Sequence, residues 1–155
     1  MKGNAKVIET LNALLADELA AINQYMVHSE MCADWGYQRL HEAVEKRAVT
    51  EMCHAEKLIG RIVFLDGRPV VSQLSQINIG AEVPGQLQHD LAAEHAAVQA
   101  YNAGIRLAVE AGDNGTRDML ESILADEEEH VDWLEAQLSQ IEHMGVQNYL
   151  VEQID

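Results

Sequence analysis

The feature that most constrains the fold is a pair of long segments that resemble each other at one constant offset, the separation between Leu11 and Leu87. Apolar residues recur at spacings of three and four in four stretches, which is the period of a helix with one buried face. This repeat offset relates the first stretch to the third and the second to the fourth. We therefore expect two similar helical hairpins related by an approximate two-fold axis. The matching pairs are Leu11 and Leu87, Leu15 and Leu91, Ile22 and Val98, Tyr25 and Tyr101, Leu58 and Leu134, and Ile62 and Leu138.

Turn sequences divide the chain into the helices of these hairpins. The segments "DWG" at 34–36, "DGRP" at 66–69, "GDNG" at 112–115 and "MG" at 144–145 are expected to end the first, second, third and fourth helix. The first helix is expected from about residue 5, and the fourth from Thr116, with Asp118 in its first turn.

Residues 67 to about 82 lack a helical period, and "VQNYLVEQI" after residue 145 predicts a short fifth helix. A long crossover between the second and third helices lets the second hairpin run back over the first. The sequence therefore predicts an all-α, antiparallel four-helix bundle with a short C-terminal helix, as one domain over residues 1–155.

The composition agrees with long helices and excludes some classes of binding partner. The chain of 155 residues is 48% apolar and 5% aromatic and has two prolines, which suits helices packed on aliphatic side chains better than a sheet sandwich. Its net charge of −16 argues against nucleic acid or an anionic membrane as a partner and favours cations. The N-terminus does not read as a signal peptide, and no run approaches the ~18 apolar residues of a membrane helix. Two cysteines without a CxxC spacing predict a reduced, cytoplasmic protein.

Each apolar stripe is interrupted by acids at one level. The stretches "TEMCHAEKL" and "DEEEHVDWL" each place a glutamate three residues before a histidine, and Glu18 precedes Glu51 by the same separation as Glu94 precedes Glu127. One Glu-x-x-His pair is weak evidence, but carboxylates in an apolar stripe cost several kcal/mol unless they are neutralised, paired or bound to metal. The two-fold relation brings all six side chains together at the bundle centre. They are Glu18, Glu51, His54, Glu94, Glu127 and His130.

Four carboxylates and two imidazoles suit iron or manganese and can also take zinc or cobalt, and two divalent ions cancel the four negative charges. This constellation resembles the dinuclear carboxylate centre of ferritin-like bundles. We expect Glu51 and Glu127 to bridge two metal ions. Glu18 and His54 would complete the coordination of one ion, and Glu94 and His130 that of the other.

Other candidates near this level are less specific. Tyr25 lies on the same face as Glu18 and could hydrogen-bond a ligand or give an electron, although a buried tyrosine with a satisfied hydroxyl is an equal alternative. Trp133 is expected only to pack. The five remaining histidines have no partner spacing and are expected on the surface or around the ligands. They are His28, His41, His89, His95 and His143.

The chain resembles bacterioferritin along its whole length. The resemblance rests on "MKG", "DELAAINQYMVH" (17–28), "EMCHAEKLIGRIVFLDGRP" (51–69), "INIG" (77–80), "LADEEEHVDWLEAQL" (124–138) and "GVQNYL" (145–150). It implies a ferroxidase that oxidises Fe(II) with oxygen or peroxide at the dinuclear centre, with two iron ions per subunit. It also implies iron storage and detoxification, as a ferric mineral in a cage of twenty-four identical subunits built from dimers.

The resemblance further implies a haem b shared by two subunits, one haem per subunit pair, which helps release iron with electrons from a bacterioferritin-associated ferredoxin. The residue that matches the haem iron ligand is Met52, which points about 100° away from Glu51 on its helix. Met26 and Glu45 stand where the family usually has aromatic residues. The matching pocket-lining residues are Leu19, Ile22, Asn23, Met26, Val49, Ala55 and Ile59.

The resemblance fails at Lys46, Arg47 and Thr50, where the family commonly has a histidine and acids on the cavity side of the second helix. We therefore do not expect an inner-surface iron site. Two alternatives stay open for storage: iron passes through the dinuclear centre, or a second type of subunit completes a mixed shell.

Two other classes of function also remain open. One is a non-storing di-metal oxidase or peroxidase of the rubrerythrin type, or a manganese catalase. The other is a structural or haem-carrying bundle without a working metal centre.

Overall fold

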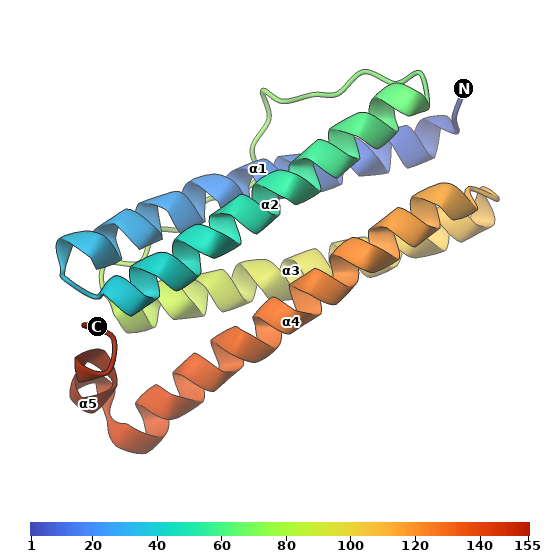
Figure 1. Ribbon diagram of the computed structural model, residues 1–155. Coiled ribbons are helices and arrows are strands. Elements are labelled where there is room, and N and C mark those ends of the chain that lie inside the picture. Colours follow the sequence, from blue (N-terminus) through green and yellow to red (C-terminus); the bar gives the residue numbers. More distant parts are fainter.

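The computed structural model describes all 155 residues and contains five helices and no strand. Figure 1 shows α1 and α2 side by side as one hairpin, and α3 and α4 as a second hairpin that lies against it. No helix is both long enough and apolar enough to span a membrane. The predicted all-α bundle with a fifth helix is thereby confirmed. The helices are α1 (Ala5–Asp34), α2 (Gln38–Phe64), α3 (Val83–Glu110), α4 (Asn114–Met144) and α5 (Val146–Val151).

The helix ends follow local chemistry. The hairpin turns place Gly36 and Gly112, which are themselves related by the repeat offset, at φ of 81° and 71°, a left-handed conformation that favours glycine. The fourth helix does not start at Thr116 as predicted. It starts two residues earlier because the Asp113 side chain accepts a hydrogen bond from the Thr116 amide at 3.0 Å and caps it. Asp118 consequently lies beyond the first turn.

Residues 65–82 form the crossover, which runs along α1 and is tied to it by hydrogen bonds at several points (Figure 1). The Val70 amide donates to Asn12 Oδ1 at 2.8 Å, and the Asn78 amide donates to Gln24 Oε1 at 3.1 Å. Near its end, the Gly80 amide donates to Nε2 of the buried His28 at 3.0 Å. Gln24 and His28 are four residues apart and share a face of α1, whereas Asn12 lies about 120° around the helix from Gln24 at ~100° per residue, so the crossover contacts α1 on more than one face.

The apolar core has two main layers, one toward each end of the bundle. One layer contains Leu11, Leu58, Ile62 and Leu120, and the other contains Leu40, Leu87, Leu134 and Tyr149 of α5. On each long helix, the acids and histidines of the apolar stripes lie between these layers in the sequence. A buried polar level therefore separates two aliphatic levels, and the bundle holds its charged side chains away from both ends.

Gly80 provides a test of how the crossover is held. A Cβ at this position would lie 2.3 Å from the Gln86 backbone nitrogen, which cannot give way, whereas a Cβ at Gly60 on α2 meets nothing within 4 Å. We expect Gly80→Ala to lower the midpoint of thermal unfolding by several degrees. Gly60→Ala should leave the free energy of unfolding unchanged or raise it by about 0.5–1 kcal/mol, because alanine favours a helix over glycine. Equal midpoints for the two variants would contradict the close packing at Gly80.

Candidate metal centre

The four glutamates and two histidines singled out in the sequence come together in the middle of the bundle, and each is at most 8% exposed. Glu18, Glu51, His54 and Glu127 can each offer one atom to a group whose members lie within 4.8 Å of one another. Glu51, Glu94 and His130 form a second such group. Glu51 belongs to both groups, whereas Glu127, the other predicted bridging residue, belongs only to the first.

Both histidines turn the same ring nitrogen toward the carboxylates. His54 Nδ1 lies 3.0 Å from Glu127 Oε1 and 3.1 Å from Glu51 Oε2, and His130 Nδ1 lies 2.9 Å from Glu94 Oε1. On its other side, His54 Nε2 lies 2.9 Å from Asp126 Oδ2. An imidazole whose far nitrogen meets a carboxylate has its orientation and tautomer fixed, which is the arrangement common among metal-binding histidines.

Two tyrosines link the hairpins reciprocally. Tyr25 on α1 donates a short hydrogen bond to Glu94 on α3, and Tyr101 on α3 donates to Glu18 Oε1 on α1 at 2.5 Å. The repeat offset relates each residue of one pair to its counterpart in the other. The contacts therefore obey the two-fold relation seen in the sequence, and Tyr25 contacts a candidate ligand. In the sequence, Tyr101 stood out only as a stripe residue, although the same offset identifies it as the counterpart of Tyr25.

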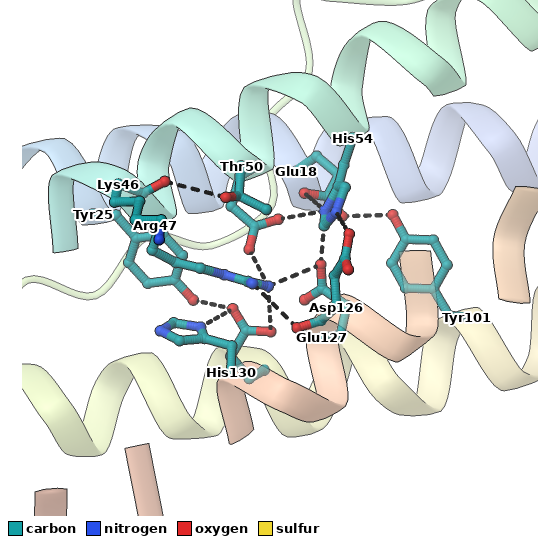
Figure 2. A network of polar contacts seen from close by, with 12 residues as sticks. Glu18, Tyr25, Lys46, Arg47, Thr50, His54, Tyr101, Asp126, Glu127 and His130 are labelled. Atoms are coloured by element: carbon teal, nitrogen blue, oxygen red, sulfur yellow. Dashed lines mark hydrogen bonds and ion pairs between the residues drawn. The ribbon is translucent and has the colours of Figure 1, made fainter. Parts of the chain in front are cut away.

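Sequence reasoning missed two residues of this centre. Arg47 was expected on the cavity side of α2, yet its Nη2 lies 2.7 Å from Glu51 Oε1 and 3.3 Å from Glu127 Oε1 (Figure 2). Because Arg47 precedes Glu51 by four residues, both share one helix face, and this spacing could have found it. Asp126, the partner of His54, carried no comparable signal because it precedes Glu127 directly and so points about 100° away from it.

Burial and mutual contact shift the pKa values of these groups in opposite directions. Burial raises the pKa of Glu18 well above its usual value, and the neighbouring Glu51 raises it further. Burial, with a contact to Glu94, also raises the pKa of Glu127 to about 11. Burial opposes ionisation of Glu51 too, but hydrogen bonds from Glu18 and His54 and the charge of Arg47 outweigh it and lower that pKa. The cluster thus balances its charge by retaining protons, which a bound cation would displace.

The donor set passes a simple test of fit for metal ions. One oxygen of each of the four glutamates is buried and makes no hydrogen bond, and these oxygens face only Arg47 Nη2 or His54 Nδ1, at 2.7–3.7 Å. Such oxygens, with two imidazole nitrogens, are the hard and borderline ligands that iron and manganese take in proteins. The cluster is compatible with a di-iron site. The four oxygens are Glu18 Oε2, Glu51 Oε1, Glu94 Oε2 and Glu127 Oε1.

Two hollows reach this centre from different helices. One, of about 270 Å³, lies between α1, α3 and the crossover and is lined by Glu18, Glu51, Glu94 and Glu127 as well as by Asp17. The other, of about 510 Å³, lies between α2 and α4. Its lining includes Lys46, Arg47, Thr50, Asp126, Glu129, His130 and Trp133. The carboxylates themselves face the first hollow, and Arg47 faces the second.

The remaining sequence candidates divide into three groups. His28, expected at the surface or around the ligands, is fully buried and contacts Asp90 Oδ1 at 2.9 Å, so it anchors α3 and the crossover. Trp133 stacks on the His130 ring at 5.8 Å between centroids, as expected of a packing residue. The candidate haem residues lie on α1 and α2, with Met52 and Met26 each 47% exposed. Half-buried beside them are Leu19, Ile22, Asn23 and Ile59.

These features define a class of protein: a helical bundle with a buried carboxylate and histidine centre that can hold two metal ions. A family described as "Ferritin-like domain" matches residues 8–144. The chain is 42% identical to a bacterioferritin of Rhodobacter capsulatus, over 96% of this chain and 92% of that protein. It is 43% identical to a bacterial ferritin of Pseudomonas aeruginosa, over 99% of this chain and 100% of that protein. A bacterial ferritin of Synechocystis sp. is 42% identical over 99% of both chains.

The chain therefore belongs to the ferritin-like family and, within it, to the bacterioferritins.

The hydrogen bond from Tyr101 to Glu18 can be tested by measuring the free energy of unfolding. Tyr101→Phe removes the donor to a buried Glu18 oxygen, so we expect a loss of about 1–3 kcal/mol in the free energy of unfolding of the metal-stripped protein. Tyr149→Phe is the matched control, because its hydroxyl donates at 2.7 Å to Gln137, which is half-buried and can be reached by water. Thermal unfolding in a chelator measures both. A larger loss for Tyr149→Phe would contradict the contact described for Tyr101.

Proposed function

We propose that this chain is an iron-storage subunit with ferroxidase activity, in which Fe(II) is oxidised at the centre between the four helices. The observation that carries the proposal is the convergence of six buried side chains that can each offer a ligand atom, including one oxygen on each of four glutamates that makes no hydrogen bond. Membership of the bacterioferritins supports iron storage as the purpose of that chemistry. The ligands are Glu18, Glu51, His54, Glu94, Glu127 and His130, with Glu51 and Glu127 between the two irons.

Fe(II) is the substrate of this reaction. Two Fe(II) ions give up one electron each, and oxygen takes both electrons and two protons to become hydrogen peroxide; peroxide can take two more of each to become water. The protein's part is to hold two ferrous ions side by side in a site of fixed negative charge that stabilises the ferric products. Tyr25 and Tyr101 orient the Glu94 and Glu18 carboxylates through their hydrogen bonds.

Storage requires a container, and we propose the cage of twenty-four subunits that the family resemblance implies. The charge of −16 suits a shell that draws in cations and nucleates a mineral. Exposed apolar side chains on the α1–α2 hairpin fit a contact between two subunits: Met26, Val27, Val49 and Met52 are each 43–50% exposed. Where such side chains gather on a surface, they mark protein contacts or ligand sites.

The exposure of Met52 on α2 also supports a haem b shared by two subunits, with Met52 of each subunit ligating its iron. A thioether suits haem iron and raises its potential, which would help electrons from a ferredoxin reach the stored mineral for release. We place the protein in the cytoplasm because both cysteines are free and a supply of Fe(II) needs a reducing compartment.

The first test is oxidation at the centre. In anaerobic protein loaded with two Fe(II) per subunit and then mixed with oxygen, we expect a fast phase that oxidises both irons. His130→Ala should slow that phase by at least roughly 10–100-fold. Loss of a residue that only supports a metal ligand already costs that much, and His130 is itself a proposed ligand. His89→Ala, an exposed histidine on α3, is the matched control and should behave as the unmodified protein.

The particle size of the same three proteins distinguishes an iron-storage cage from a non-storing enzyme. Gel filtration should place both variants and the parent at several hundred kDa. A dimer or tetramer with a fast iron phase would instead indicate a non-storing di-metal oxidase, and unchanged oxidation in His130→Ala would contradict the assigned centre.

The haem proposal is tested separately. Met52→Leu keeps the size and apolar character of the side chain but removes the sulfur, so we expect reconstituted protein to lose the Soret band of bis-methionine haem while the fast iron phase is unchanged. Met144→Leu, an exposed methionine at the end of α4, should keep the band. The assignment of Met52 is wrong if both variants bind haem with the same spectrum as the parent.

A further inference from the structure

Arg47 occupies the position where a cation of the centre would be needed. Its Nη2 lies 2.7 Å from Glu51 Oε1, 3.3 Å from Glu127 Oε1 and 3.7 Å from Glu94 Oε2, and the side chain is 11% exposed (Figure 2). Three buried carboxylates thus meet one guanidinium. Because opposite charges attract strongly away from water, this contact supplies part of the positive charge that the cluster needs.

The guanidinium is held by charge more than by directed hydrogen bonds. Arg47 Nε and Nη2 are buried without a hydrogen-bond partner, and the side chain's one hydrogen bond runs from Nη1 to the backbone oxygen of Asp126 at 3.1 Å. Arg47 also lines the hollow of about 510 Å³ between α2 and α4, together with Glu129 and Asp126. A flexible side chain next to open space and other acids can leave the centre without losing all its partners.

The two-fold relation is broken at this point. The repeat offset carries Arg47 onto Ile123, which is fully buried and uncharged. The position that matches Asp126 is Thr50, whose hydroxyl bonds to the Lys46 backbone and not to a histidine. His54 therefore has a carboxylate behind it, at 1% exposure, whereas His130 has none and is 8% exposed.

The two halves of the centre consequently differ in how ready they are for a metal ion. The half made by Glu18 and His54 has a fixed imidazole, and Arg47 does not contact Glu18. In the half made by Glu94 and His130, Glu94 Oε2 lies 3.7 Å from the guanidinium, whose closer contacts are to Glu51 and Glu127 between the two halves. A cation entering that half meets a positive charge that must first move away.

We propose that Arg47 is a displaceable internal cation: in the metal-free protein it holds Glu94 together with Glu51 and Glu127, the two glutamates between the halves, and it withdraws when a second divalent ion binds. The two metal positions then fill in order, the Glu18–His54 half first. This inference rests on the dinuclear centre of the proposed function. It assigns Arg47 a positioning role that controls the affinity of the second ion.

Co(II) binding measures that affinity without iron turnover. Metal-stripped, assembled protein is titrated anaerobically with Co(II) and followed by its visible absorption. The parent should bind two Co(II) per subunit in two resolved steps. In Arg47→Gln, the second step should become at least about tenfold tighter, within the usual range for coupled sites, and the first should change less.

Lys46→Gln is the matched control. It removes the same charge from the neighbouring residue, which lines the same hollow but is exposed and contacts none of the carboxylates. We expect its two Co(II) affinities to equal those of the parent. Thermal unfolding gives a second readout: Arg47→Gln should melt lower than the parent when stripped of metal and should gain more on Co(II) loading. A residue with only a structural role would lower both melting temperatures equally.

The outcomes separate the inference from the function on which it depends. If neither parent nor variants bind Co(II) at the centre, the dinuclear site itself is wrong. The role of Arg47 is overturned if the second affinity is the same in parent and Arg47→Gln, or if Lys46→Gln reproduces the change. It is also overturned if the parent binds one Co(II) and Arg47→Gln binds two, because the guanidinium would then be a permanent occupant.

Discussion

The structure depends on the burial of four carboxylates at one level of a bundle that is otherwise aliphatic. Taking such groups out of water costs several kcal/mol each unless a positive charge meets them. Here the compensation comes from Arg47, from His54, whose pKa the surrounding carboxylates raise to about 12 despite its burial, and from retained protons, because the pKa values of Glu18 and Glu127 are raised. The apolar layers on either side shield this level from water along the bundle axis, and the contacts within it become stronger for that reason.

Much of the fold was predictable because its information is local and repeated. Helical periodicity, turn residues and the repeat offset predicted the bundle, and the reciprocal bonds of Tyr25 and Tyr101 follow that offset. The start of α4 was misplaced by two residues because Asp113 acts as a cap, which depends on one side-chain contact. His28 was misjudged because its partners, Asp90 and Gly80, come from distant segments that no spacing rule connects.

The candidate ligands were predictable for the same reason, but their surroundings were not. Asp126 reaches His54 only because α2 and α4 pass close to each other at this level. Arg47 shares a helix face with Glu51, yet an arginine at that spacing usually forms a surface ion pair worth little. The long side chain of Arg47 can point to solvent or into the bundle. In this structure it points inward and contacts the buried Glu51.

The two-fold relation and its exceptions have different physical origins. Two equivalent hairpins are an economical way to bring six ligands to one point, since each hairpin needs only a glutamate on one helix and a Glu-x-x-His pair on the other. Symmetry in the ligands does not require symmetry behind them, however. The first hairpin has Arg47 where the second has Ile123, and the second has Asp126 where the first has Thr50. These two differences leave every ligand in place but change the charge near each half of the centre. Because charge acts over longer distances than packing inside a protein, two substitutions outside the ligand set are enough to make the halves unequal.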